Sequence, residues 1–67
     1  MFQIYDVVRL VKPIVSKQEL LPGTKGTILI IYDTKEEPFY EVEFVDNQGN
    51  SLAIVTVPNE FLEIYSK

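Results

Sequence analysis

The sequence predicts an all-β fold in which five short antiparallel strands form one small, partly open barrel. Three observations support this prediction. β-branched and aliphatic residues gather in short runs, one run alternates apolar and charged residues with a period of two, and glycine, proline and asparagine interrupt the chain between the runs. The chain has 67 residues, so we expect a single domain over residues 1–67.

The first strand is predicted over residues 5–12, in the run YDVVRLVK, and Pro13 ends it. A long loop follows and closes at Gly23 and Gly26, directly before the apolar run GTILIIYD of residues 26–33. Glycine accepts positive φ angles and lets other atoms approach the backbone closely. We therefore interpret the two glycines as the end of the loop and the start of the second strand.

The third strand, FYEVEFVD at residues 39–46, has the clearest pattern. One face holds Tyr40, Val42 and Phe44, and the other holds Glu41 and Glu43. This period of two indicates a strand with one buried face. The polar segment DTKEEP before it is typical of a loose hairpin that joins the second strand to the third.

The chain then turns back on itself. The segment DNQGN of residues 46–50 predicts a tight hairpin in which Gly49 takes a positive φ angle. A fourth strand follows in SLAIVTVP, residues 51–58, and ends at Pro58. The final segment PNEFLEIY begins with proline and asparagine, which favours one turn of 3₁₀ helix before a short last strand.

This order of elements is that of an SH3-like barrel, which hides most strand edges and lets a small chain bury one face of every strand. An OB-like barrel is the alternative. That fold usually needs a longer chain and a helix between the third and fourth strands, where this sequence has only DNQGN. The predicted fold is therefore a single five-stranded antiparallel SH3-like barrel with one 3₁₀ turn before its last strand.

The composition argues against several functions. Cysteine and histidine are both absent, so the chain offers no disulfide, no cysteine-based zinc site and no imidazole base. Six basic residues are outnumbered by ten acidic ones, which gives a formal net charge of −4. Nucleic-acid-binding proteins rely on basic surfaces to attract phosphates, and the basic residues here are scattered along the sequence. We therefore expect protein partners, or no macromolecular partner, rather than a nucleic acid.

The N-terminal segment MFQIYDVVRLV carries Asp6 and Arg9 within its apolar run and lacks the basic start and cleavage site of a signal peptide. No apolar run approaches the ~20 residues that are needed to span a bilayer. We therefore expect a cytoplasmic protein with no membrane partner.

Three segments resemble ligand or catalytic sites, and each has a simpler interpretation. Gly23 and Gly26 resemble a phosphate-binding loop, but that loop needs a following Lys-Ser/Thr and a helix, whereas a strand follows here. The segment DNQGN offers oxygen ligands for calcium but only one carboxylate, Asp46. The carboxylates of the DTKEEP hairpin have no pocket to perturb their pKa values. We predict no catalytic residue, no metal site and no cofactor.

Three of the predicted strands are apolar on both faces. If the inward side chains are Val8, Leu10, Ile28, Ile30, Ala53, Val55 and Val57, the outward ones are Val7, Val11, Leu29, Ile31, Leu52 and Ile54. Coverage of these side chains by the long loop alone is the structural alternative. Otherwise they form a contiguous apolar patch of the kind that marks protein contacts. We predict this interface at Leu29, Ile31, Glu41, Glu43, Leu52 and Ile54.

The motifs resemble a known family. Residues 6–10 and 23–28 are similar to the opening strands of KOW-type and related SH3-like barrels. More specifically, the whole chain resembles a family of small bacterial proteins catalogued as a domain of unknown function. Its pattern DVVxL, GxxGTI, YEVEFxDxxG and AxxTxP is matched at residues 6–10, 23–28, 40–49 and 53–58, with a closing Leu62. The resemblance implies a fold and brings no established activity.

These observations favour a non-enzymatic protein-interaction module. Apolar side chains beside a row of glutamates suit a basic protein partner, as in an antitoxin or immunity protein that masks a basic effector. A symmetric dimer built on the same face would crowd four glutamates together, so we favour the foreign partner there and leave self-association through the first strand open. The alternative function is nucleic-acid binding by a KOW-like barrel, and the net charge argues against it.

Overall fold

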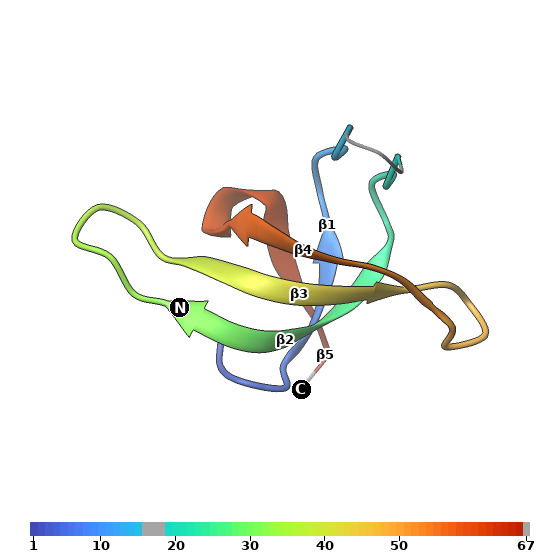
Figure 1. Ribbon diagram of the computed structural model, residues 1–67, viewed down its shortest axis with the longest axis horizontal. Helices are drawn as coiled ribbons and strands as arrows, with labels where there is room; N and C mark the ends of the chain where they lie inside the picture. Colours follow the sequence, from blue (N-terminus) through green and yellow to red (C-terminus); the bar gives the residue numbers. More distant parts are fainter. Residues whose placement is uncertain (16–18, 67) are drawn as a thin grey trace.

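The computed structural model describes residues 1–15 and 19–66, and strands dominate it (Figure 1). In chain order the elements are β1 (Val7–Leu10), β2 (Lys25–Tyr32), β3 (Phe39–Val45), β4 (Ser51–Pro58), the 3₁₀ turn η1 (Asn59–Phe61) and β5 (Leu62–Ser66). All the strand pairings are antiparallel. The predicted all-β class, the five strands and the 3₁₀ turn before the last strand are confirmed.

The five strands form one sheet in the order β4-β3-β2-β1-β5, and this sheet is not closed. Its edge strands are therefore β4 and β5. β2, β3 and β4 form a meander, whereas β5 returns to the far side of β1. In Figure 1, β1 and β5 run at a steep angle to β3 and β4, so the sheet curls around a core on its inner side.

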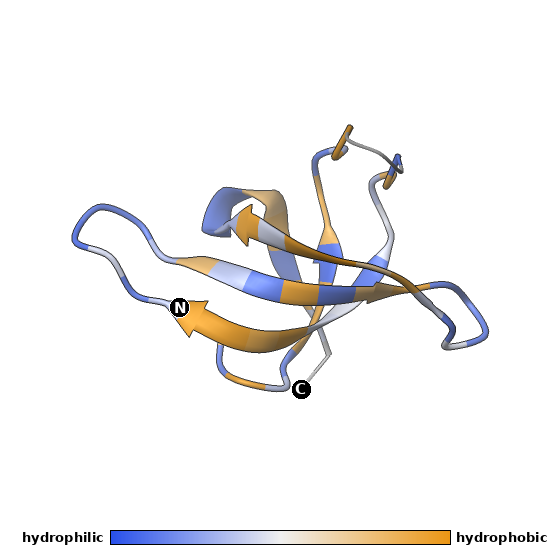
Figure 2. Ribbon diagram, in the orientation of Figure 1, coloured by the Kyte–Doolittle hydropathy of each residue, from blue (hydrophilic) through white to orange (hydrophobic). Residues whose placement is uncertain are grey.

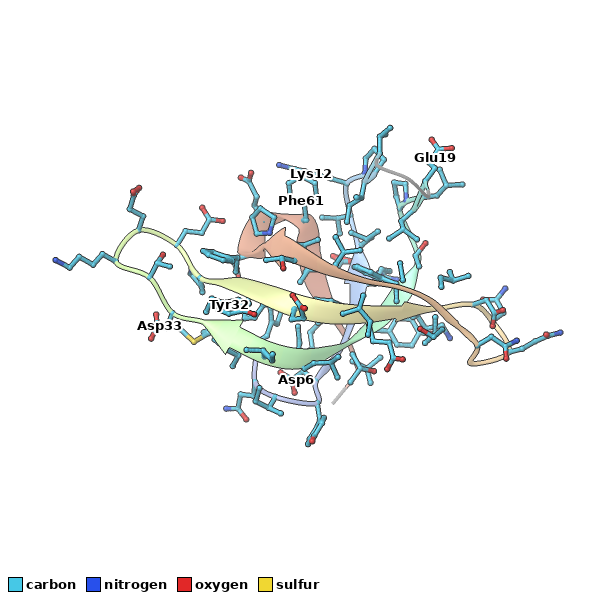
Figure 3. The ribbon with its side chains drawn as sticks, viewed as in Figure 1. Asp6, Lys12, Glu19, Tyr32, Asp33 and Phe61 are labelled. Carbon is cyan, nitrogen blue, oxygen red and sulfur yellow. The ribbon has the colours of Figure 1, made fainter. Side chains whose placement is uncertain are left out.

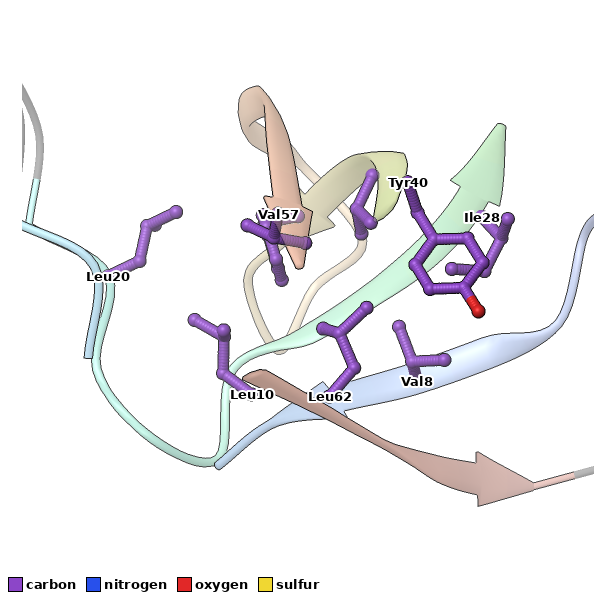
Figure 4. Close-up of a cluster of buried hydrophobic side chains, with 9 residues drawn as sticks. Val8, Leu10, Leu20, Ile28, Tyr40, Val57 and Leu62 are labelled. Atoms are coloured by element: carbon purple, nitrogen blue, oxygen red, sulfur yellow. The ribbon is translucent and has the colours of Figure 1, made fainter. Parts of the chain in front are cut away.

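The inner side of the curled sheet carries the core (Figure 4). Its buried side chains are Val8, Leu10, Leu20, Ile28, Tyr40, Val42, Phe44, Val57 and Leu62. Along β3 the buried residues alternate with half-buried ones, and Figure 2 shows the matching alternation of hydropathy. Because the chain has no cysteine, this packing has to stabilise the fold without a disulfide.

The second half of β2 is oriented differently from the prediction. The ladder to β3 skips Leu29, since Ile28 and Ile30 pair with successive residues of β3. A bulge of this kind adds one residue and exchanges the inward and outward positions beyond it. Ile31 therefore packs against the core, whereas Ile30 is 46% exposed. The predicted inward orientation of Ile30 and outward orientation of Ile31 are both wrong.

A second irregularity lies at the start of β4. Two successive residues of β3 pair with Ser51 and Ala53, which leaves Leu52 between them without a partner. Leu52 packs against the core, so its predicted outward orientation is wrong for the same physical reason. Farther along the strand the ladder is regular, and Ile54 points outward with 56% of its surface exposed.

The long loop between β1 and β2 covers one end of the core. Ile14 and Leu20 form an isolated antiparallel bridge in which each N–H donates to the other residue's carbonyl oxygen over 2.9 Å. Leu20 is buried, and Ile14 packs against the core from the same loop. Val15 and Leu21 of this loop remain exposed. The loop therefore buries only part of its own apolar surface.

Gly26 lies on β2 directly beside two buried side chains of the neighbouring strand β3. A Cβ atom at this position would be 2.6 Å from Val42 Cγ1 and 2.9 Å from Phe44 Cδ1. Both distances are shorter than real carbon contacts, so any side chain here has to displace the core. Gly23 and Gly49 lie in open space instead, with φ angles of +96° and +84°. The loop and the tight hairpin thus use backbone conformations that favour glycine.

Tyr40 connects three parts of the chain. Its hydroxyl donates a hydrogen bond to Asn59 Oδ1 over 2.8 Å and accepts one from the Phe2 N–H over 3.2 Å. The Phe2 ring also packs on the Tyr40 ring, with centroids 5.3 Å apart. The buried phenol is therefore fully hydrogen-bonded, and it fixes the N-terminal segment and η1 to β3.

Candidate protein-interaction face

The side of β2, β3 and β4 that faces away from the core is the candidate site, and we call it the outer face. Its apolar and aromatic members are Leu29, Ile30, Tyr32, Phe39, Val45 and Ile54, and its polar members are Lys25, Thr27, Glu41, Glu43 and Thr56. Alternation along each strand places these side chains opposite the buried ones, apart from Leu29, which occupies the bulge, is half-buried and is not among the residues packed against the core. The outer face therefore combines exposed aliphatic, aromatic and acidic groups on three neighbouring strands.

Glu41 and Glu43 form a carboxylate row along the middle of the outer face. Ile30 pairs with Glu41 from β2, and Ile54 pairs with Glu43 from β4. Thr56 Oγ1 donates a hydrogen bond to Glu41 Oε1 over 2.6 Å. The described residues form two ion pairs, Arg9 with Glu63 and Lys12 with Glu60, and neither pair involves Glu41 or Glu43. The row therefore presents negative charge between two exposed isoleucines, and in the described part of the chain neither glutamate forms an ion pair.

An aromatic pair borders the carboxylate row. Tyr32 at the end of β2 and Phe39 at the start of β3 stack with their ring centroids 5.3 Å apart and an interplanar angle of 30°. Figure 3 shows Tyr32 where β2 leads into the loop that begins with Asp33. Stacked rings of this kind offer a flat, rigid apolar surface, which is the character of many binding hot spots.

The structure places four of the predicted interface residues on this face: Leu29, Glu41, Glu43 and Ile54. Ile31 and Leu52 contact the core instead, because the two bulges turn their side chains inward. The sequence interpretation missed Ile30 and the aromatic pair. The run ILII contains no polar residue that could reveal a change of phase. The similar positions of Tyr32 and Phe39 on either side of the DTKEEP hairpin could have indicated their contact.

The basic residues are less scattered in space than they are in the sequence. Arg9 and Lys25 pair across β1 and β2. Both lie over the ring of Tyr65, at 5.7 Å and 4.8 Å from its centroid, in the geometry of cation–π contacts. Arg9 also forms an ion pair and a hydrogen bond with Glu63 on β5.

Lys12 continues this basic region beyond the end of β1. Its Nζ lies 5.4 Å from the centroid of the Phe61 ring and 3.7 Å from Glu60 Oε1 (Figure 3). Three of the six basic residues therefore lie on β1, on its neighbour β2 or just beyond the end of β1. Carboxylates of η1 and β5 pair with Lys12 and Arg9, which limits the positive charge that this region presents.

A hollow of about 560 Å³ lies between the N-terminal segment and η1. It is lined by Met1, Phe2, Gln3, Asp6, Asn59 and Ile64. Asp6 is the one carboxylate in this lining, and its Oδ2 accepts a hydrogen bond from the Gln3 N–H over 2.8 Å. In the described parts of the chain, carboxylates do not gather in groups of three or more that could hold a metal ion.

Asp46, the candidate calcium ligand of the sequence, organises the tight hairpin between β3 and β4. Its Oδ1 accepts hydrogen bonds from the N–H groups of Gln48 and Asn50, each over 2.9 Å. The bond from the Asn50 N–H, followed by the one from the Gln48 N–H, makes the largest contribution to lowering the pKa of the Asp46 carboxyl below its ordinary value. The arrangement is that of an Asx turn, and it uses the carboxylate to hold the backbone.

Comparison of the chain with known proteins assigns it to a family but does not assign an activity. The part of the chain that the structure describes contains no helix that is long and apolar enough to cross a membrane. A search of curated proteins finds no match, and neither does a search of solved structures. A family model matches residues 4–64, which is nearly the whole chain. The chain therefore belongs to the family described as a domain of unknown function (DUF4926).

Proposed function

We propose that this chain is a non-enzymatic protein-interaction module whose outer face binds a basic protein. The observation that carries the proposal is the carboxylate row of Glu41 and Glu43 between the exposed side chains of Ile30 and Ile54. A partner that covers the isoleucines also removes the carboxylates from water. That removal costs free energy unless lysine or arginine pairs with them. The face therefore suits a partner that brings basic side chains to the row and apolar ones to its flanks.

Two copies of this chain are less suited to each other through the outer face. Stacking two such faces would bring four glutamates together, and like charges at close range repel. A foreign partner with a basic surface meets the same row with attraction. An antitoxin or immunity protein that masks a basic effector is one role with this chemistry.

The wider interpretation is a small SH3-like binding barrel without an enzymatic activity. The order of five strands with η1 before the last one supports the SH3-like arrangement. The lack of histidine and cysteine, together with the hollow that has a single carboxylate in its lining, supports a role in binding rather than catalysis.

The test is capture of a partner by the wild-type chain and by two matched double variants. The Ile30→Lys/Ile54→Lys variant places two positive charges on the outer face and should abolish capture. It should remain folded, because both side chains are exposed. The Val15→Lys/Leu21→Lys variant adds the same charges at exposed aliphatic positions of the loop and should retain capture. The proposal would be contradicted if both variants lost capture or if both retained it.

Nucleic-acid binding is the second candidate function, and one observation favours it. Arg9 and Lys25 lie over the exposed ring of Tyr65, and aromatic rings beside cations are a common platform for single strands. The ion pair of Arg9 with Glu63 and the formal net charge of −4 weaken the attraction for phosphates. We therefore place this function below protein binding.

A further inference from the structure

The free edge of β4 offers main-chain hydrogen-bonding groups. Among the described strands, β3 is the only neighbour of β4. The Asn59 N–H donates to the Pro38 carbonyl oxygen over 3.1 Å, so residues 38 and 59 form a hydrogen-bonded pair at the end of the β3–β4 ladder. In an antiparallel ladder, hydrogen-bonded pairs alternate with non-hydrogen-bonded ones. Counting from that pair, Val55 belongs to a hydrogen-bonded pair and directs its N–H and C=O groups at β3. Ile54 and Thr56 belong to non-hydrogen-bonded pairs and direct theirs away from the sheet. Two donors and two acceptors therefore line the edge.

Between its two ends, this edge lacks the features that usually prevent strands from pairing. β4 has eight residues, Ser51–Pro58, and none of them is charged. Natural edge strands are commonly protected by charged side chains, proline, bulges or short length. Here Pro58 and the bulge at Leu52 protect only the two ends. The other edge strand, β5, has five residues and carries Glu63 in an ion pair with Arg9.

We propose that two copies of this chain associate edge to edge through β4, antiparallel, about a two-fold axis near Val55. In this arrangement Ile54 of one copy lies opposite the partner subunit's Thr56, and the reverse pairing occurs on the other side of the axis. Each of these two pairs exchanges two main-chain hydrogen bonds, so four bonds join the copies. The two sheets become one, and the groups at both free edges are satisfied.

The second copy suits this edge for electrostatic reasons. The strand is uncharged, so antiparallel self-pairing brings no like charges face to face. The carboxylate rows of Glu41 and Glu43 lie on β3, one strand behind each edge. Three strand spacings then separate the two rows, roughly 14 Å. That distance exceeds the screening length of about 8 Å at physiological ionic strength. The inference uses the main-chain groups at the edge of β4, whereas the proposed function uses the side chains of the outer face, and neither depends on the other.

The first test compares the mass of the chain in solution with that of two variants of Thr56. Sedimentation of the wild type should show a dimer whose share rises with concentration. Thr56→Pro removes the N–H that points away from the sheet, without removing a bond to β3, and should raise the dissociation constant of the dimer roughly tenfold or more. Thr56→Ala also removes the hydrogen bond to Glu41 but keeps the N–H, so it should dimerise like the wild type. A wild type that is monomeric at all concentrations, or a Thr56→Pro variant that is folded and fully dimeric, would overturn the proposal.

A cysteine variant tests the geometry even if Thr56→Pro does not fold. The chain has no cysteine, so Val55→Cys introduces a single thiol. Near the axis the two copies of residue 55 form a non-hydrogen-bonded pair with Cα atoms about 4.5 Å apart, a separation that a disulfide can span. Mild oxidation should therefore cross-link Val55→Cys rapidly. Thr27→Cys on the central strand β2 is the control and should cross-link slowly. Equal rates for the two variants would rule out the edge-to-edge dimer.

Discussion

Thr56 and Glu41 face each other across β4 and β3, and the Thr56 hydroxyl donates a hydrogen bond of 2.6 Å to Glu41 Oε1. This bond fixes one carboxylate of the row against the sheet. It leaves Oε2 of the same carboxylate available to a donor from a partner. The row is thus partly ordered before any partner arrives, which reduces the entropy lost on binding.

The core prediction concerns Phe44, which is fully buried on the inner side of β3. Phe44→Ala should lower the free energy of unfolding by roughly 3–5 kcal/mol, a loss comparable to the whole stability of so small a domain. Phe39→Ala is the matched control, because Phe39 is half-buried on the outer face of the same strand. Chemical denaturation of both variants measures the difference. Equal losses would mean that the two faces of β3 are assigned incorrectly.

The second prediction concerns the close approach at Gly26. Gly26→Val should destabilise the fold more than Lys25→Val, because a Cβ atom at residue 26 would lie 2.6 Å from Val42 Cγ1. Lys25 is half-buried, and the contact of its ammonium with the Tyr65 ring is the main loss in the control variant. Thermal melting of the two variants under the same conditions is the measurement. Similar melting temperatures would show that the core adapts to a side chain at Gly26.

The third prediction tests the bulge in β2. Ile31→Lys should destabilise the fold by several times more than Ile30→Lys, since Ile31 packs against the core and Ile30 is exposed. A surface substitution usually changes the free energy of unfolding by about 0.5 kcal/mol or less. Denaturant titrations of both variants provide the comparison. The reverse order of stabilities would restore the regular alternation that the sequence suggested.

The fourth prediction concerns nucleic acid. The formal net charge is −4, and Arg9 is paired with Glu63, so binding to duplex DNA or single-stranded RNA should be weaker than about 10⁻⁴ M at physiological salt. Fluorescence anisotropy with labelled oligonucleotides measures this binding. Glu63→Gln removes the carboxylate that pairs with Arg9 and should lower the dissociation constant for these oligonucleotides. Salt-sensitive micromolar binding by the wild type would make nucleic-acid binding the leading function.

The fifth prediction follows from the lowered pKa of Asp46. A carboxyl group whose pKa is lower in the folded chain than in the unfolded chain adds stability above its unfolded pKa, near 3.9. That contribution is lost as the pH falls through the lower pKa of the folded state. Asp46→Ala should therefore be less stable than the wild type at neutral pH, and the difference should shrink in strong acid. Denaturation at a series of pH values measures it, and a difference that does not change with pH would exclude the carboxylate as its origin.

Much of the fold could be predicted because its signals are local. The alternation in FYEVEFVD determines both the existence of β3 and the side that it buries. The segment DNQGN specifies its hairpin through Asp46 and Gly49, whose roles depend on neighbouring atoms only. Element order could therefore be worked out from residues that are close together in the chain.

The errors arose where the outcome depends on packing between distant residues. In the run ILII every residue is apolar, so the phase of β2 is set by how Ile28 and Ile31 fit the core and not by any polar neighbour. The same reason explains the position of Leu52. The contact of Arg9 and Lys25 with Tyr65 requires the register of β1 with both β2 and β5, which no local pattern contains.

The hydroxyl of Tyr40 has a consequence for how the chain folds in time. Its two partners, Phe2 and Asn59, lie 38 and 19 residues away along the chain. Contacts over such separations form only after long segments have been brought together, at a cost in chain entropy. The two hairpins of the meander are local and can form within microseconds. Asn59 also pairs with Pro38 at the end of the β3–β4 hairpin, so we expect this partner to arrive with the hairpin. The bond from the Phe2 N–H should form later, when the segment before β1 docks on β3.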